Sequence, residues 1–266
     1  AAALFQKFGA VAAESTFPAL VYGAFSGMAL TVFNLVPSVT NMFGKSVLPC
    51  AAQSWAKGQK EAVQKQLQSV LFLTALIALP AAGGLFCLSD SILTLLYPGQ
   101  ETACRIAAES LRSLLPGMVF LCFTMPLFSI LQGIGRADLP VKYMLPCVAV
   151  KLLGNLLFLQ IPACSLLGAG LSTSLCYALL FGMTLFSLCR MLGMSLRGLK
   201  PILPLCYAAT MSITTAYLFR NLTRTMPLPV MLLCSVGSAV VMYGVVLLLL
   251  EKTANRLREG LCFRMV

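Results

Sequence analysis

A lysine in the middle of an apolar segment is the most conspicuous chemical group of this sequence. Residues 143–161 form a run of 19 residues that is long enough to cross the hydrocarbon core of a bilayer, and Lys151 is the ninth of them. A cation at the bilayer midplane costs about 2.5–3.5 kcal/mol on insertion scales, so we expect Lys151 to face the protein interior or a water-filled cavity. Asn155 follows one helical turn later on the same face, which also carries Cys147 and Gly154. This face is polar and partly small, and it is the first candidate site.

Two further polar residues lie inside the first apolar run of the chain. Asn34 comes shortly before Pro37, and an Asn in this setting is typical of helix packing or of a kink. Lys45 lies near the predicted cytoplasmic third of the same helix, where a long side chain can extend to the interface. We keep Lys45 and Asn34 as weaker candidates for a polar site beside Lys151 and Asn155.

The composition predicts a polytopic membrane protein. Of the 266 residues 59% are hydrophobic and only 10% are charged, whereas soluble domains average about 25% charged residues. The net charge is +11, and the cations lie between the apolar runs. We therefore interpret them as a topology signal and as contacts with anionic membrane lipids, and we expect no nucleic acid partner.

The sequence indicates no enzyme, metal centre or cofactor. Eleven cysteines are scattered singly, most of them inside apolar runs, and the chain has no histidine and no C-x-x-C pattern. Buried cysteines of this kind act as small apolar side chains. No nucleophile–base pair is recognisable either, so we predict no catalytic residue.

Hydropathy predicts an all-α membrane bundle of about seven full transmembrane helices. The expected spans are residues 26–53, 67–88, 106–131, 143–161, 167–191, 201–219 and 228–250. We expect part of residues 15–44 to be an extracellular connection and residues 89–101 to lie flat in the interface. The start of the fifth span is rich in Gly and Ser and predicts close helix packing. Four charges should form an ion-pair ladder along one helix: Glu101, Arg105, Glu109 and Arg112.

The distribution of Lys and Arg predicts the orientation. The connections after the first, third and fifth spans and the C-terminal tail are rich in basic residues, at positions 57, 60, 65, 136, 142, 190, 197, 200, 252, 256, 258 and 264. The other connections carry only Arg105, Arg220 and Arg224. The positive-inside rule therefore places the first set, including the C-terminus, in the cytoplasm.

Three groups of short motifs resemble one family of transporters. They are YGAFSGMAL with FNL and Pro37 at residues 22–37, SVLP with ALPAAGGL at 46–49 and 78–85, and ILQGIGR, LP, KLLGN and LGAG between 130 and 170. In their order and spacing they are similar to the C-terminal half of stage V sporulation protein B-type polysaccharide flippases. That group belongs to the multidrug/oligosaccharidyl-lipid/polysaccharide exporter superfamily and is related to the lipid II flippases. Gly154 and Lys45 depart from the family pattern.

This resemblance implies a domain organisation. It covers residues 15–195, and members of the family have about fourteen spans in two six-helix lobes with extra helices after the second. Residues 1–195 would form the second lobe, incomplete at its start, and residues 196–266 two additional C-terminal helices and a cytoplasmic tail. The N-terminal lobe of the same protein would be missing, and the chain begins without an initiator Met.

The resemblance also implies a function. Such flippases move a polyprenyl-pyrophosphate-linked sugar or peptidoglycan precursor across the cytoplasmic membrane by alternating access, in cell-wall synthesis or sporulation. Lys151 would then be a cation that faces the phosphates, and Asn155 a donor to sugar or phosphate oxygens. The alternative for Lys151 is a structural role, in which it bonds to backbone carbonyls of a neighbouring helix.

Two other functions compete with the flippase. The first is a cation-coupled multidrug antiporter of the same superfamily, which would use a buried carboxylate. The acids outside the C-terminal tail lie near span ends, for example Glu14, Asp90 and Asp138, and the central charge is positive, which favours an anionic substrate. The second is a membrane scaffold in cell-wall assembly that transports nothing.

Overall fold

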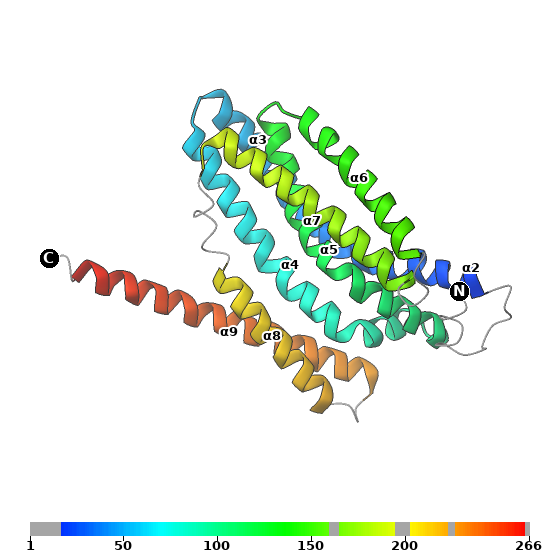
Figure 1. Ribbon diagram of the computed structural model, residues 1–266. Coiled ribbons are helices and arrows are strands. Elements are labelled where there is room, and N and C mark those ends of the chain that lie inside the picture. The colour runs from blue at the N-terminus through cyan, green and yellow to red at the C-terminus, as the bar shows by residue number, and fades with distance from the viewer. Residues whose placement is uncertain (1–16, 160–164, 195–202, 223–226, 264–266) are drawn as a thin grey trace.

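The chain folds into a bundle of helices (Figure 1). The computed structural model describes residues 17–159, 165–194, 203–222 and 227–263, and within these ranges it contains no strand. Its elements are α2 (Phe17–Gly23), η1, a π-helical segment (Ala24–Ala29), α3 (Leu30–Ala56), α4 (Lys60–Leu96), α5 (Glu101–Gly133), α6 (Asp138–Leu159), α7 (Ser165–Leu192), α8 (Leu203–Leu222) and α9 (Leu228–Phe263). The predicted all-α class is confirmed.

Six helical segments in the described ranges are long and apolar enough to cross a membrane. They are Ala19–Ala56, Lys60–Leu96, Glu101–Gly133, Asp138–Leu157, Gly170–Leu192 and Pro229–Leu249. The remaining long helix, α8, coincides with the predicted span 201–219. Large apolar side chains such as Leu145, Phe186 and Leu233 are exposed on the outside of the bundle, as lipid contact requires. The protein is a multi-pass membrane protein.

Helix α5 forms the centre of the bundle. It packs against α3, α4 and α7, while α6 packs mainly on α7, and α8 and α9 pack on each other and on α4 (Figure 1). In the most apolar 18-residue stretch of α5, 72% of the residues are buried, whereas in the corresponding stretch of α6 only 11% are buried. Helix α6, which carries Lys151, therefore lies at the edge of the bundle and contacts the rest through one face.

The contact between α5 and α7 is made by small residues, as the sequence predicts for this part of α7. The backbone N–H of Gly117 donates to the Ser174 hydroxyl at 3.0 Å, and this hydroxyl donates to the Ser113 carbonyl at 3.1 Å. Ser174 thereby bridges a donor and an acceptor of the α5 backbone beside Pro116, which lacks an N–H. This bridge helps α5 to remain one helix across Pro116, which could have broken it.

Two predictions about connections are wrong. Residues 17–56 form one helical run through α2, η1 and α3, with no connection inside it. Likewise α4 continues to Leu96 instead of ending before a flat interfacial segment, because Leu88 and Leu93 of its last turns are buried. In apolar surroundings a helix satisfies its own backbone, so a charge-free stretch stays helical even when it exceeds one bilayer.

The basic connections gather at one end of the bundle. The α3–α4 turn, the α5–α6 turn and the end of α7 lie together there (Figure 1). Their exposed cations include Lys57, Lys60, Arg136 and Arg190. The three connections that the charge count assigns to one side of the membrane thus lie on one side of the molecule.

Candidate substrate-binding site

The face of α6 that carries Lys151 packs along α7. Near the basic end of this seam the Tyr143 hydroxyl donates to the Ser187 hydroxyl at 2.9 Å, and Cys147 is buried next to it. Further along, a Cβ on Gly154 would lie 2.9 Å from the Ser172 Cβ. Gly154, which departs from the family pattern, therefore lets the two helices approach closely at this level.

Lys151 lies half-buried in this seam. It is 13 residues from the start of a 22-residue helix, or about 20 Å along it, which is near the middle of the span. Its ammonium group is close enough to the Cys176 thiol of α7 for an electrostatic interaction. Among the described residues, Lys151 forms no hydrogen bond or ion pair. The structure thus places a cation on a partly covered face near the middle of the span, where the described residues offer it no counter-ion.

Asn155 is held in place beside Lys151. Its Oδ1 accepts a hydrogen bond from the Ser172 hydroxyl of α7. The bond fixes the side chain on the same face of α6 as the lysine, one helical turn away. A side-chain amide also carries two donors, so Asn155 can still serve an oxygen-rich ligand while Ser172 holds its carbonyl.

Asn34 and Lys45 lie on a different surface, the exposed face of α3. Asn34 is exposed, and the Ser38 hydroxyl donates to its backbone carbonyl at 2.7 Å. Thr31, Ser38 and Lys45 are exposed along the same side of the helix. Polar groups within a membrane span are expensive against lipid, so this face should border water or another part of the protein.

The four candidate residues therefore form two pairs rather than one cluster. The helices that carry them are arranged in the order α3, α5, α7 and α6. Tyr177 of α7 connects the pairs, because its ring stacks on Phe33 of α3 with 6.3 Å between centroids and also packs beside Cys147. An aromatic pair thus lies between the two polar faces.

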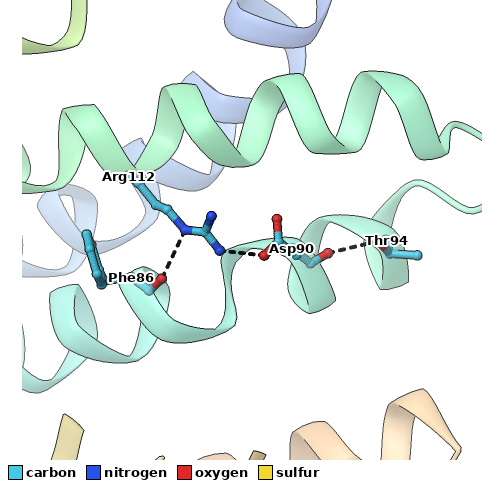
Figure 2. Close-up of polar contacts among 4 residues, drawn as sticks. All are labelled: Phe86, Asp90, Thr94 and Arg112. Atoms are coloured by element: carbon cyan, nitrogen blue, oxygen red, sulfur yellow. Dashed lines mark hydrogen bonds and ion pairs between the residues drawn. The ribbon is translucent and has the colours of Figure 1, made fainter. Parts of the chain in front are cut away.

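The sequence analysis missed an ion pair between α4 and α5. The guanidinium of Arg112 pairs with Asp90 of α4, and its Nε donates to the Phe86 carbonyl at 3.4 Å (Figure 2). Residues 97–100 join α4 to α5 as antiparallel neighbours. An acid in the last turns of α4 and a cation in the first half of α5 were the signal that could have suggested a pair between the two helices. In the described part of the chain no three His, Cys, Asp or Glu residues gather as metal ligands would.

Comparison with known proteins decides the family. Residues 23–157, half of the chain, match the MatE family. The chain belongs to the MatE family. Members of this family are membrane transporters of the exporter superfamily that the sequence motifs indicated, and they are not enzymes.

Two known proteins are similar to this MatE chain. An uncharacterized membrane protein of Methanocaldococcus jannaschii, MJ1068, is 25% identical over 157 residues, which are 59% of this chain and 30% of that protein. Among solved structures, the lipid II flippase MurJ in its inward closed conformation has the same fold, with a TM-score of 0.65 at 16% identity over 89% of this chain and 47% of the MurJ chain. The chain thus spans less than half the length of both relatives.

Proposed function

We propose that this MatE chain is part of a flippase that moves a lipid-linked sugar across the cytoplasmic membrane. The observation that carries the proposal is the half-buried ammonium of Lys151 near the middle of a span, which pairs with no carboxylate among the residues that the structure describes. Such a charge is expensive in a bilayer and marks a substrate or ion path. A pyrophosphate head group would supply the missing negative charge while it crosses the membrane.

The positions of the acids support an anionic substrate rather than an exchanged cation. Among residues whose side chains the structure describes, Glu61 and Asp138 lie at the basic end of the bundle, and Asp90, Glu101 and Glu109 lie towards the opposite end. Asp90 is further occupied by Arg112. The described part of the chain thus provides no central carboxylate for a proton- or sodium-coupled antiporter.

The two polar faces would act together during alternating access. Asn155 would donate to phosphate or sugar oxygens beside Lys151, and Asn34 and Lys45 on the exposed face of α3 would border the path that the complete protein encloses. In this proposal residues 1–195 form the second lobe and residues 196–266 add two helices, in line with the packing of α8 and α9 on each other and on α4. The basic end, and with it the C-terminus, faces the cytoplasm.

A flipping assay tests the proposal. The full-length protein is reconstituted in liposomes with a fluorescent polyprenyl-pyrophosphate sugar, and wild type is compared with Lys151→Ala and Lys151→Arg. Because a hydrogen bond to a charged group contributes about 1.5–3 kcal/mol, we expect flipping to fall roughly 10- to 100-fold in the alanine variant and to recover partly in the arginine variant.

Lys142→Ala is the matched control. Lys142 lies on the same helix, is exposed, and pairs with Asp138 at 2.9 Å, so its loss should leave flipping unchanged. If Lys151→Ala flips as fast as wild type, Lys151 is structural, and the antiporter and the scaffold become the better explanations. Proton-coupled uptake of cationic dyes would then separate those two.

A further inference from the structure

A groove runs along the last turns of α7, on a side of the helix that the proposed substrate path does not use. Its volume is about 500 Å³, within the range of small-molecule sites, and its described lining comes from the end of α7 and the two residues that follow it: Gly182, Leu185, Phe186, Cys189, Arg190, Gly193 and Met194. Leu180 and Ser187 of α7 instead face α6. The groove and the Lys151 seam are therefore separate surfaces.

Gly182 keeps the groove open. A Cβ at this position would meet nothing within 4 Å, whereas Gly117, Gly154 and Gly170 are each pressed against a neighbouring helix. Close packing therefore does not explain a glycine at position 182, in the middle of a helix. Phe186, one turn later, is 69% exposed. The result is an apolar hollow on the surface of the bundle, and within a bilayer hydrocarbon would fill it better than water.

Arg190 stands at the mouth of this hollow. It is exposed in the last turn of α7, and it forms no ion pair with any residue that the structure describes. Arg112 and Lys142, in contrast, each form an ion pair with a carboxylate. A guanidinium offers paired donors that match the oxygens of a phosphate.

The depth and the surroundings of the groove fit one class of ligand. Arg190 lies eight positions after Gly182 in the helix, so the hollow extends about 12 Å from the cation towards the bilayer centre. Lys57, Lys60 and Arg136 are exposed at the same end of the bundle and add positive potential, which attracts anionic lipid head groups. A phosphate would pair with Arg190 at one end of the groove, and an acyl chain of the same molecule would fill the apolar part that extends to Gly182.

We propose that this groove on α7 binds an anionic phospholipid of the leaflet that borders the basic end, with its phosphate on Arg190 and one acyl chain beside Phe186 and Gly182. The site does not depend on the flippase proposal, because it involves neither Lys151 nor the exposed face of α3. A cation at a helix C-terminus is favourable even without a lipid. The experiment must therefore measure lipid binding directly.

Binding is measured by the thermal unfolding midpoint of the full-length protein in neutral detergent, titrated with phosphatidylglycerol. A ligand that binds only the folded state stabilises it by RT ln(1 + [L]/Kd), so the rise of the midpoint with ligand concentration reports Kd. We expect Arg190→Gln to bind about tenfold more weakly than wild type. Gly182→Leu keeps the charge but fills the hollow, and we expect a similar loss. Arg136→Gln, at an exposed cation of the α5–α6 turn, is the matched control: it removes one charge of the basic end without touching the groove, so its binding should weaken far less than that of Arg190→Gln.

Two further titrations identify the source of the phosphate. Phosphatidylcholine, which has no net charge, and glycerol phosphate, which has no acyl chain, should each shift the midpoint far less than phosphatidylglycerol. The proposal is overturned if Arg190→Gln or Gly182→Leu retains wild-type binding, or if Arg136→Gln loses as much as Arg190→Gln. It is also overturned if either of these two compounds alone matches phosphatidylglycerol.

Discussion

The contact between α5 and α7 at Gly117 offers the sharpest test of the packing. In Gly117→Ala the new Cβ would lie 2.9 Å from the Ser174 Cα and 3.0 Å from its Oγ. The hydroxyl can rotate away, but the backbone Cα cannot, so α5 and α7 must separate. Overpacking of this kind costs about 1–3 kcal/mol. Separation also weakens the hydrogen bond from the Gly117 N–H to Ser174, which contributes about 1 kcal/mol.

The gain in helix propensity from Gly to Ala returns about 1 kcal/mol, so the net destabilisation of Gly117→Ala is about 1–3 kcal/mol. Thermal unfolding of the purified protein measures it, at about 2–4 °C per kcal/mol for a domain of this size. Gly182→Ala is the control, because its Cβ meets nothing within 4 Å, and its midpoint should stay equal or rise slightly. If both variants unfold at the same temperature, the close approach of α5 and α7 at this level is refuted.

Three further predictions concern the charged and polar groups. Asp90→Asn should destabilise the protein by about 0.5–1 kcal/mol, because the pair with Arg112 is partly exposed, and a double-mutant cycle with Arg112→Gln should show coupling that falls with salt. Lys151→Met should raise the unfolding midpoint while flipping falls, because it removes a charge that costs about 2.5–3.5 kcal/mol in a bilayer. Asn34→Cys should react with a membrane-impermeant maleimide in the full-length protein, whereas Leu145→Cys, which is 70% exposed on α6 but faces lipid, should not.

Each of these predictions has an outcome that contradicts it. Additive effects at Asp90 and Arg112 would show that the two groups do not interact. A lower midpoint in Lys151→Met would indicate that the ammonium is bonded within the protein. Equal labelling of the two cysteines, in a background without the exposed Cys50 and Cys234, would show that the α3 face does not differ from a lipid-facing surface.

The sequence by itself determined the class of protein and the path of the chain through the membrane. A bilayer offers no partner to a backbone N–H or C=O, so an apolar run of sufficient length must become a helix, and hydropathy alone predicts it. The spans that contain α5 and α7 were predicted within a few residues of their ends for this reason. The central place of Lys151 could also be read from spacing, since position along a single helix is a local property.

The tertiary structure alone decided which faces meet. Three features depend on neighbours far away in the chain. They are the exposure of Asn34, the pairing of Arg112 with Asp90 of α4, and the glycine at position 154 in place of a bulky residue. Helix ends were uncertain for the same reason, as α4 continues through Leu93 because α5 buries that side chain. Hydropathy measures the partition of one segment into lipid, whereas these features depend on the contact between two helices, and that contact exists only once both are packed in the bundle.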